Sequence, residues 1–117
     1  DALGNDIGPS VRRAAARGLG QLNFEALAPV QRRATAERCL QALVEGCRDG
    51  EWVVRYSVVV GLESLAPALH PDQAEGPAAQ QRLHEALIGL RRNPTEEAPV
   101  VQLRAALALQ RLGASHD

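Results

Sequence analysis

The sequence predicts an all-α fold in which about five helices stack as antiparallel pairs. Three similar segments begin at Val11, Val54 and Val101, so they lie 43 and 47 residues apart. Two other segments, with apolar residues at helical spacing, separate them. No stretch favours a β-strand. Helical pairs repeated at such an interval are typical of α-solenoids, in which each repeat packs on its neighbours.

The three similar segments predict helices near 9–22, 51–66 and 99–113. They read "VRRAAARGLGQL", "VRYSVVVGLESL" and "VQLRAALALQRL". Each has a small residue followed by leucine at its eighth and ninth positions, and each ends on leucine at its twelfth. These residues share one helical face, which we expect to pack on a partner helix.

The two intervening segments predict the partner helices, near 29–48 and 77–92. "PVQRRATAERCLQALVEGC" begins at Pro29 and "PAAQQRLHEALIGLRR" at Pro77, and proline is well suited to a first helical position. Both carry apolar residues at i, i+3, i+4 and i+7. Helical pairs with this period indicate a HEAT or armadillo solenoid, so we predict a HEAT-like α–α superhelix. The first repeated helix would then lack its partner upstream.

The central segment, "EWVVRYSVVVGLESL", is apolar on nearly every side although a surface helix should be half polar. In a stack, the central helix contacts its own partner and neighbours on both sides. We therefore expect this helix to be buried by tertiary packing, with Gly61 allowing a close approach.

Composition excludes several classes of protein. The chain has 117 residues, is 45% hydrophobic and carries a net charge of −1, with its arginines interspersed among acids, which does not favour a nucleic-acid partner. No apolar run is long enough to span a membrane. We interpret residues 1–117 as a single HEAT-like repeat domain and, because methionine is absent, as a piece of a longer protein.

The sequence offers no conventional catalytic or metal site. Cys39 and Cys47 fall in one predicted helix, where eight residues span about 12 Å, too far for a disulfide. We read them as small buried residues in a reducing compartment. Histidine pairs, Cys-x-x-Cys, a phosphate-binding glycine loop and a serine nucleophile elbow are all missing.

The repeated helices are expected to line the concave surface of the stack. On the central helix the stripe left over after packing contains Tyr56, Val60 and Glu63. The equivalent residues of the other two repeats are Arg13, Arg17 and Gly20, and Leu103, Leu107 and Gln110. Trp52 lies one turn before Tyr56. Two scarce aromatic residues beside one surface favour a flat ligand or a partner groove. The alternative, that Trp52 packs on the preceding helix and Tyr56 fills a gap between repeats, stays open.

Arg55 follows Val54 as Arg12 follows Val11, and an arginine at this repeat position is usually structural. We expect it to pair with an acid in the adjacent turn, Asp49 or Glu51. The neighbouring acids Glu96 and Glu97 indicate a helix start, where negative charge complements the dipole.

The segment "DGEWVVRYSVVVGLESL" resembles the phycobilisome lyase HEAT-like repeat family, and the resemblance extends over most of the chain. It implies attachment of an open-chain tetrapyrrole, phycocyanobilin or phycoerythrobilin, to a cysteine of a phycobiliprotein subunit. It also implies cytoplasmic work in a cyanobacterium, with a second lyase subunit as a possible heterodimer partner. The bilin would be a substrate and not a permanent cofactor.

The resemblance, combined with the repeat register, gives candidate site residues. Arg13 and Arg17 would meet the bilin propionates, and Trp52 and Tyr56 its rings. Glu63 would meet the pyrrole nitrogens, and Tyr56 and Glu63 are the catalytic candidates. The competing hypothesis is a non-catalytic HEAT-repeat adaptor that binds a protein partner during phycobilisome assembly or degradation.

Overall fold

A computed structural model describes residues 8–69 and 76–114, and these form five α-helices, two short 3-10 helices and no strands. Each α-helix begins and ends within two residues of the bounds that the sequence predicts. The elements are α1 (Pro9–Gly20), η1 (Phe24–Ala26), α2 (Pro29–Gly46), α3 (Trp52–Leu65), η2 (Ala66–Ala68), α4 (Gly76–Arg92) and α5 (Pro99–Ala114).

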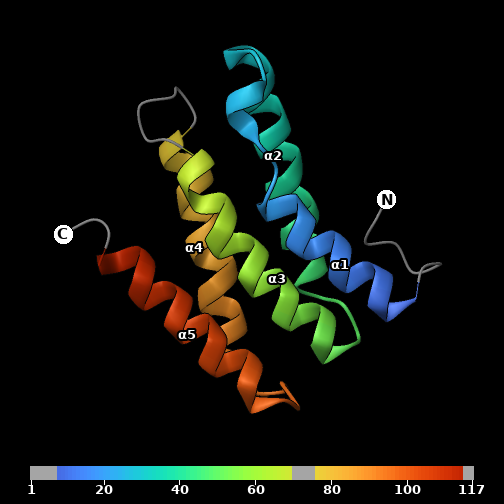
Figure 1. Ribbon diagram of the computed structural model, residues 1–117. Helices are drawn as coiled ribbons and strands as arrows, with labels where there is room; N and C mark the ends of the chain where they lie inside the picture. Colours follow the sequence, from blue (N-terminus) through green and yellow to red (C-terminus); the bar gives the residue numbers. More distant parts are fainter. Residues whose placement is uncertain (1–7, 70–75, 115–117) are drawn as a thin grey trace.

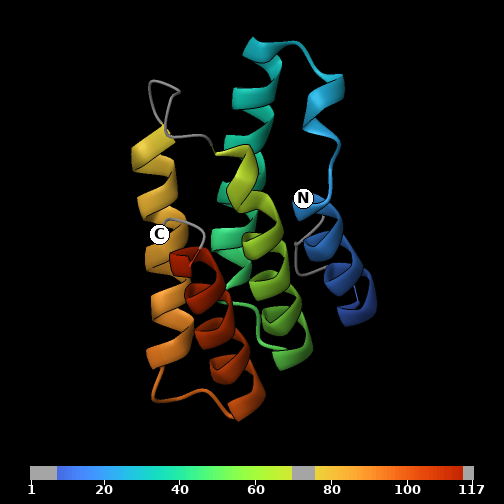
Figure 2. The ribbon, with the colours of Figure 1, turned by 60° about the vertical axis from the view of Figure 1, so that its left-hand side comes forward.

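The α-helices form two layers, as the predicted superhelix requires (Figures 1 and 2). The three repeated helices α1, α3 and α5 lie side by side and run in the same direction, while α2 and α4 cover them from behind. The surface of α1, α3 and α5 that is turned away from α2 and α4 is called the open face below. It is the surface that the sequence predicts to carry the site.

Helix α3 occupies the centre of the stack and packs against α1, α2 and α5. Its valines and leucines contribute a large share of the hydrophobic core, with Val54, Val58, Val59, Leu62 and Leu65 fully buried. Burial on several sides at once explains why this helix is apolar around most of its circumference. Tertiary packing offsets the poor helix propensity of its five valines.

Two glycines bring the backbones of α1 and α3 into contact. A methyl group added at Gly20 would overlap the carbonyl oxygen of Gly61 and come within 2.9 Å of its Cα atom. A methyl group added at Gly61 would overlap the carbonyl oxygen of Ala16 and lie 3.0 Å from Leu43 Cδ2. Gly61 therefore allows the close approach that the sequence predicts.

The same contact corrects the prediction for Gly20. The repeat register places it on the exposed stripe beside Arg13 and Arg17, but it is buried against α3. Helix α1 turns its Arg12, Ala16 and Gly20 side towards α3, because these residues recur every four positions along one helical face.

Candidate functional site

A cavity of about 290 Å³ opens on the open face near the beginnings of α3 and α5. Four of the five candidate residues line it, namely Arg13, Arg17, Trp52 and Tyr56. The remaining lining residues are Val53, Ser57 and Val100. The structure therefore brings together residues of α1 and α3 that stand about 40 positions apart in the sequence.

Helical periodicity explains why these side chains converge. Arg13 and Arg17 are four residues apart on α1, as Trp52 and Tyr56 are on α3, so each pair shares one side of its helix. Trp52 is 42% exposed, and Tyr56 is half-buried. An exposed indole beside a cavity favours the ligand interpretation of Trp52 over packing on the preceding helix.

The two arginines are the cationic part of the cavity. Within residues 8–69 and 76–114, neither Arg13 nor Arg17 lies in an ion pair, whereas Arg12, Arg55 and Arg104 all contact carboxylates. Arg17 Nε donates a hydrogen bond of 3.3 Å to Oγ of the fully buried Ser57, which fixes the side chain against α3. The cavity therefore offers two positive charges that can pair with an anionic ligand.

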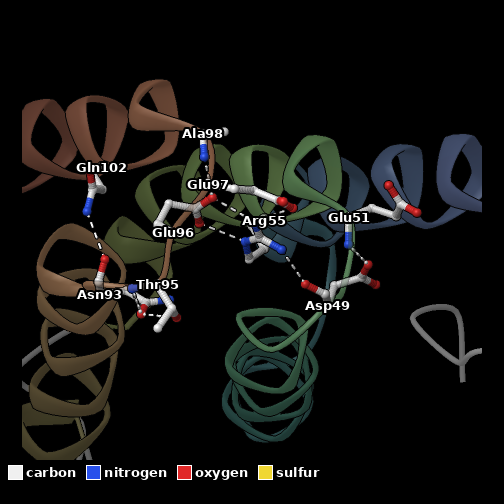
Figure 3. Close-up of polar contacts among 9 residues, drawn as sticks. All are labelled: Asp49, Glu51, Arg55, Asn93, Thr95, Glu96, Glu97, Ala98 and Gln102. Atoms are coloured by element: carbon white, nitrogen blue, oxygen red, sulfur yellow. Dashed lines mark hydrogen bonds and ion pairs between the residues drawn. The ribbon is translucent and has the colours of Figure 1, made fainter.

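Arg55, by contrast, holds α3 to the segment before α5 (Figure 3). Its Nε and Nη2 atoms donate to the two carboxylate oxygens of Glu96 at 2.7 and 2.6 Å, and Nη1 donates to the carbonyl oxygen of Asp49 at 2.7 Å. The structural role that the sequence predicts for Arg55 is confirmed. The predicted partner is wrong, because the acid comes from the next repeat and not from the carboxylates of Asp49 or Glu51.

Glu96 therefore does more than complement a helix dipole. Its side chain is fully buried, and Oε2 also accepts a 3.0 Å hydrogen bond from the Ala98 amide just before α5. The hydrogen bonds from Arg55 hold the pKa of Glu96 below its ordinary value. One carboxylate thus joins the beginning of α3 to the beginning of α5.

The same arrangement recurs between α1 and the turn before α3. Arg12 donates two hydrogen bonds to the Asp49 carboxylate, at 2.7 and 3.0 Å, and Asp49 Oδ1 accepts the Glu51 amide at 3.0 Å (Figure 3 shows the Asp49–Glu51 contact). Burial alone would raise the pKa of Asp49. Hydrogen bonds from Arg12 and the Glu51 amide outweigh burial and lower it. These two ion pairs hold together the beginnings of α1, α3 and α5, which is the end of the layer where the cavity lies.

Glu63, the fifth candidate, lies outside the cavity lining. It is on the same side of α3 as Tyr56, two turns further along, and is held from α5 by Arg104 at 2.7 Å and Arg111 at 3.4 Å. Its catalytic role remains a proposal and requires a ligand that extends beyond the cavity.

Sequence reasoning missed three lining residues. Ser57 had a signal, because it is a polar residue within a run of valines. Val100 had a weaker one, because it directly precedes the first residue of the third repeat. Val53 carries no signal, since a valine in a buried helix is expected.

A second cavity, of about 390 Å³, lies near the other ends of α1 and α3, beside η1 and η2. It contains none of the candidate residues. Its lining combines Phe24, Glu25 and Arg32 with small and apolar residues, and Arg32 Nε already donates to the Leu27 carbonyl oxygen at 2.8 Å. It lacks the pair of aromatic residues and the two arginines without ion pairs, so the first cavity is the candidate site.

Residues 8–69 and 76–114 contain no group of three side chains that could together hold a metal ion. None of the helices described here is long and apolar enough to cross a membrane.

Comparison with known proteins relates part of the chain to a known repeat family. Residues 11–49 match the family model described as the PBS lyase HEAT-like repeat. Over these residues the chain carries that family's repeat. The chain is 41% identical over 116 residues to the bilin biosynthesis protein RpcF of Synechococcus sp. WH8020, covering 97% of this chain and 50% of that protein.

Two further relatives agree. The phycocyanobilin lyase subunit beta of Nostoc sp. PCC 7120 is 35% identical over 108 residues, covering 92% of this chain and 49% of that protein. The solved complex of CpcE and CpcF of phycocyanin lyase from Nostoc sp. PCC7120 matches with a TM-score of 0.76 and 34% identity, covering 92% of this chain and 58% of that one. The chain thus spans about half the length of the curated relatives it matches.

Proposed function

We propose that this chain is part of a phycobilin lyase, or of its paired subunit, which binds an open-chain tetrapyrrole and positions it for attachment to a phycobiliprotein cysteine. The observation that carries the proposal is the cavity itself. It joins Arg13 and Arg17, which lie in no described ion pair, to Trp52 and Tyr56, in a chain whose relatives include a bilin biosynthesis protein and a lyase subunit.

The cavity suits the chemistry of a bilin. Two propionates match the two arginines, since guanidinium groups bind carboxylates through paired hydrogen bonds. Flat conjugated rings match the faces of Trp52 and Tyr56. Tyr56 and Glu63 are the proton-carrying groups that we propose as catalytic, with Glu63 facing the pyrrole nitrogens.

The reaction needs a thiol that this chain does not supply. Cys39 is buried, and burial raises the pKa of the partly buried Cys47 thiol to about 12, so neither offers thiolate at neutral pH. The attacking thiol would belong to the phycobiliprotein. Addition across a carbon–carbon double bond of the bilin forms the C–S bond and leaves the thiol proton on the bilin, so no oxidant is needed.

The protein's part would then be positioning. Holding the bilin extended, presenting one face to the thiol and excluding water can together replace much of the entropic cost of a bimolecular step. The bilin is a substrate in this scheme and leaves with the phycobiliprotein. A second lyase subunit would complete the site, and the cyanobacterial relatives suggest that the reaction takes place in the cytoplasm.

Co-expression tests the proposal. The intact protein, with its paired subunit, is produced alongside bilin biosynthesis and an apo-phycobiliprotein, and covalent coloured product is measured. We expect Arg13→Gln with Arg17→Gln to reduce product strongly, and Tyr56→Phe and Glu63→Gln each to slow it. Arg38→Gln, at an exposed arginine of α2, is the matched control and should leave it unchanged.

The adaptor hypothesis gives a different result. A non-catalytic adaptor would yield no coloured product with any acceptor. Product that is insensitive to both arginines would reject this cavity as the bilin site. Unchanged transfer in both Tyr56→Phe and Glu63→Gln would remove these two residues from the mechanism.

A further inference from the structure

We infer that three exposed aliphatic side chains of α5, Val100, Leu103 and Leu107, form a second part of the tetrapyrrole site, on which one outer ring of the bilin lies. This inference rests on the proposed function. It concerns a surface that begins at Val100 in the cavity lining and continues outside the cavity, and it can be tested separately from the cavity. The three residues are called the α5 strip below.

The cavity is small for a tetrapyrrole. At about 290 Å³ it lies at the bottom of the range of roughly 300–1,000 Å³ that encloses a drug-sized ligand. A tetrapyrrole with four rings and two propionates stands at the large end of that class. The cavity is too small to enclose the whole pigment, so part of the pigment, including an outer ring, lies on a surface that adjoins the cavity.

The α5 strip is the apolar surface that leads away from the cavity. Val100 belongs to the cavity lining, and Leu103 and Leu107 follow at i+3 and i+7 on the same side of the helix. The three positions extend over about 10 Å of helix axis. Leu103 is 70% exposed, and Val100 and Leu107 are 42% and 37% exposed.

The other direction is less suitable for an apolar ring. Across α1 the cavity wall consists of Arg13 and Arg17. The exposed apolar neighbours on that helix are one valine, Val11, which is 54% exposed, and small residues such as Ala14. Exposed aliphatic residues gathered in one row beside a cavity mark a contact surface more often than scattered ones do. The two inner rings, which carry the propionates, therefore belong at α1, and one outer ring lies on α5.

The same placement brings the ligand to Glu63. Arg104 and Arg111 both contact its carboxylate, and they lie three residues before and four residues after Leu107 on α5. Glu63 must therefore lie beside the turn of α5 that carries Leu107. A tetrapyrrole whose outer ring reaches Leu107 has the nitrogen of that ring near this carboxylate, which reconciles the position of Glu63 outside the cavity with its proposed role.

Binding measurements on the intact protein test the inference. Phycocyanobilin is titrated against the wild type and Leu103→Gln/Leu107→Gln, and the absorbance change of the bound pigment is followed. We expect the double variant to bind at least tenfold more weakly, the loss anticipated when two leucine contacts disappear. Val30→Gln, at a valine that is 74% exposed on α2, is the matched control and should bind normally.

A two-ring fragment separates the two parts of the site. A dipyrrole that carries one propionate on each ring should bind the leucine variant as tightly as the wild type. It should lose affinity in Arg13→Gln/Arg17→Gln. Because both leucines are solvent-exposed, circular dichroism should show the leucine variant to be as folded as the wild type.

Other occupants of the α5 strip predict other outcomes. If the leucine variant binds phycocyanobilin with wild-type affinity, the inference is overturned. Loss of bilin transfer in that variant would then indicate that the strip docks the acceptor protein. Loss of a dimer in sedimentation would indicate that the strip binds a second copy of the chain. Loss of affinity in the arginine variant alone would keep the proposed function and reject the α5 strip. Absence of binding to the wild type would reject both.

Discussion

The glycine contact between α1 and α3 makes the same substitution, glycine to alanine, have opposite effects at positions two residues apart. Gly20→Ala places a methyl group into the Gly61 backbone, 2.9 Å from its Cα atom. Gly18→Ala, on the same helix, meets no heavy atom within 4 Å. The two variants share a helix and a gain in helix propensity, and they differ only in what the methyl group touches.

The magnitude follows from the geometry. Carbon–oxygen contacts rarely fall below about 3.3 Å, so α1 and α3 must separate by about 1 Å at this crossing. Backbone cannot rotate away as a side chain can, so the cost should lie at or above the upper end of the roughly 1–3 kcal/mol typical of overpacking. Alanine regains about 1 kcal/mol of helix propensity. We expect a net loss of about 2–3 kcal/mol for Gly20→Ala and a gain of up to about 1 kcal/mol for Gly18→Ala.

Urea unfolding followed by circular dichroism measures both values, with the free energy taken from the linear extrapolation. Gly61→Ala should behave like Gly20→Ala, because its methyl group overlaps the Ala16 carbonyl oxygen and meets Leu43 Cδ2 at 3.0 Å. If Gly20→Ala proves as stable as Gly18→Ala, the two helices are not in backbone contact. The closeness of α1, which carries Arg17, to the α3 side of the cavity would then need another explanation.

Three other perturbations have defined outcomes. Glu96→Gln should lower the free energy of unfolding by about 2–4 kcal/mol, near the cost of breaking a buried ion pair, because it removes the charge that faces Arg55. The depressed pKa of Glu96 contributes stability that is fully present above its unfolded-state pKa of about 4.3 and is lost as pH falls towards its lower folded-state pKa. In parallel urea titrations, the wild type should therefore lose more stability than Glu96→Gln between about pH 5 and about pH 3. Equal losses would contradict the pairing of Glu96 with Arg55. At about pH 8, an aromatic disulfide reagent should react with the Cys47 thiol, whose pKa is about 12, far more slowly in the folded protein than in urea. Equal rates would show that the thiol is accessible in the folded protein.

The fold was within reach of the sequence because it repeats. Three segments with equivalent leucines and small residues predict three equivalent helices, and two proline-headed segments between them predict their partners. A helix such as α3, apolar on most sides, is inconsistent with any position except the centre of such a stack. Local patterns and the repeat interval therefore agree on one architecture.

The same reasoning could not predict which charged groups form ion pairs. Sequence proximity suggested Asp49 or Glu51 as the partner of Arg55, whereas the stack places Glu96, 41 residues away, against its guanidinium group. The prediction that Gly20 lies on the exposed stripe was wrong for a related reason. Repeat register assigns each residue the surroundings of its equivalents. Within residues 8–69 and 76–114, however, α1 packs against α3 alone in its layer and turns a different side towards it.

Ion pairs mark Arg12 and Arg55 as structural, whereas Arg13 and Arg17 are set apart by the cavity that they line. Arg12 and Arg55 occupy equivalent repeat positions and both bind a carboxylate that belongs to the next repeat. Arg13 and Arg17 point to the open face, where the described chain provides no carboxylate for either. Leaving two adjacent cations without acidic partners costs stability through their mutual repulsion, whereas a dianionic ligand would relieve it. The same arrangement on a cavity that also carries Trp52 supports the proposed ligand site.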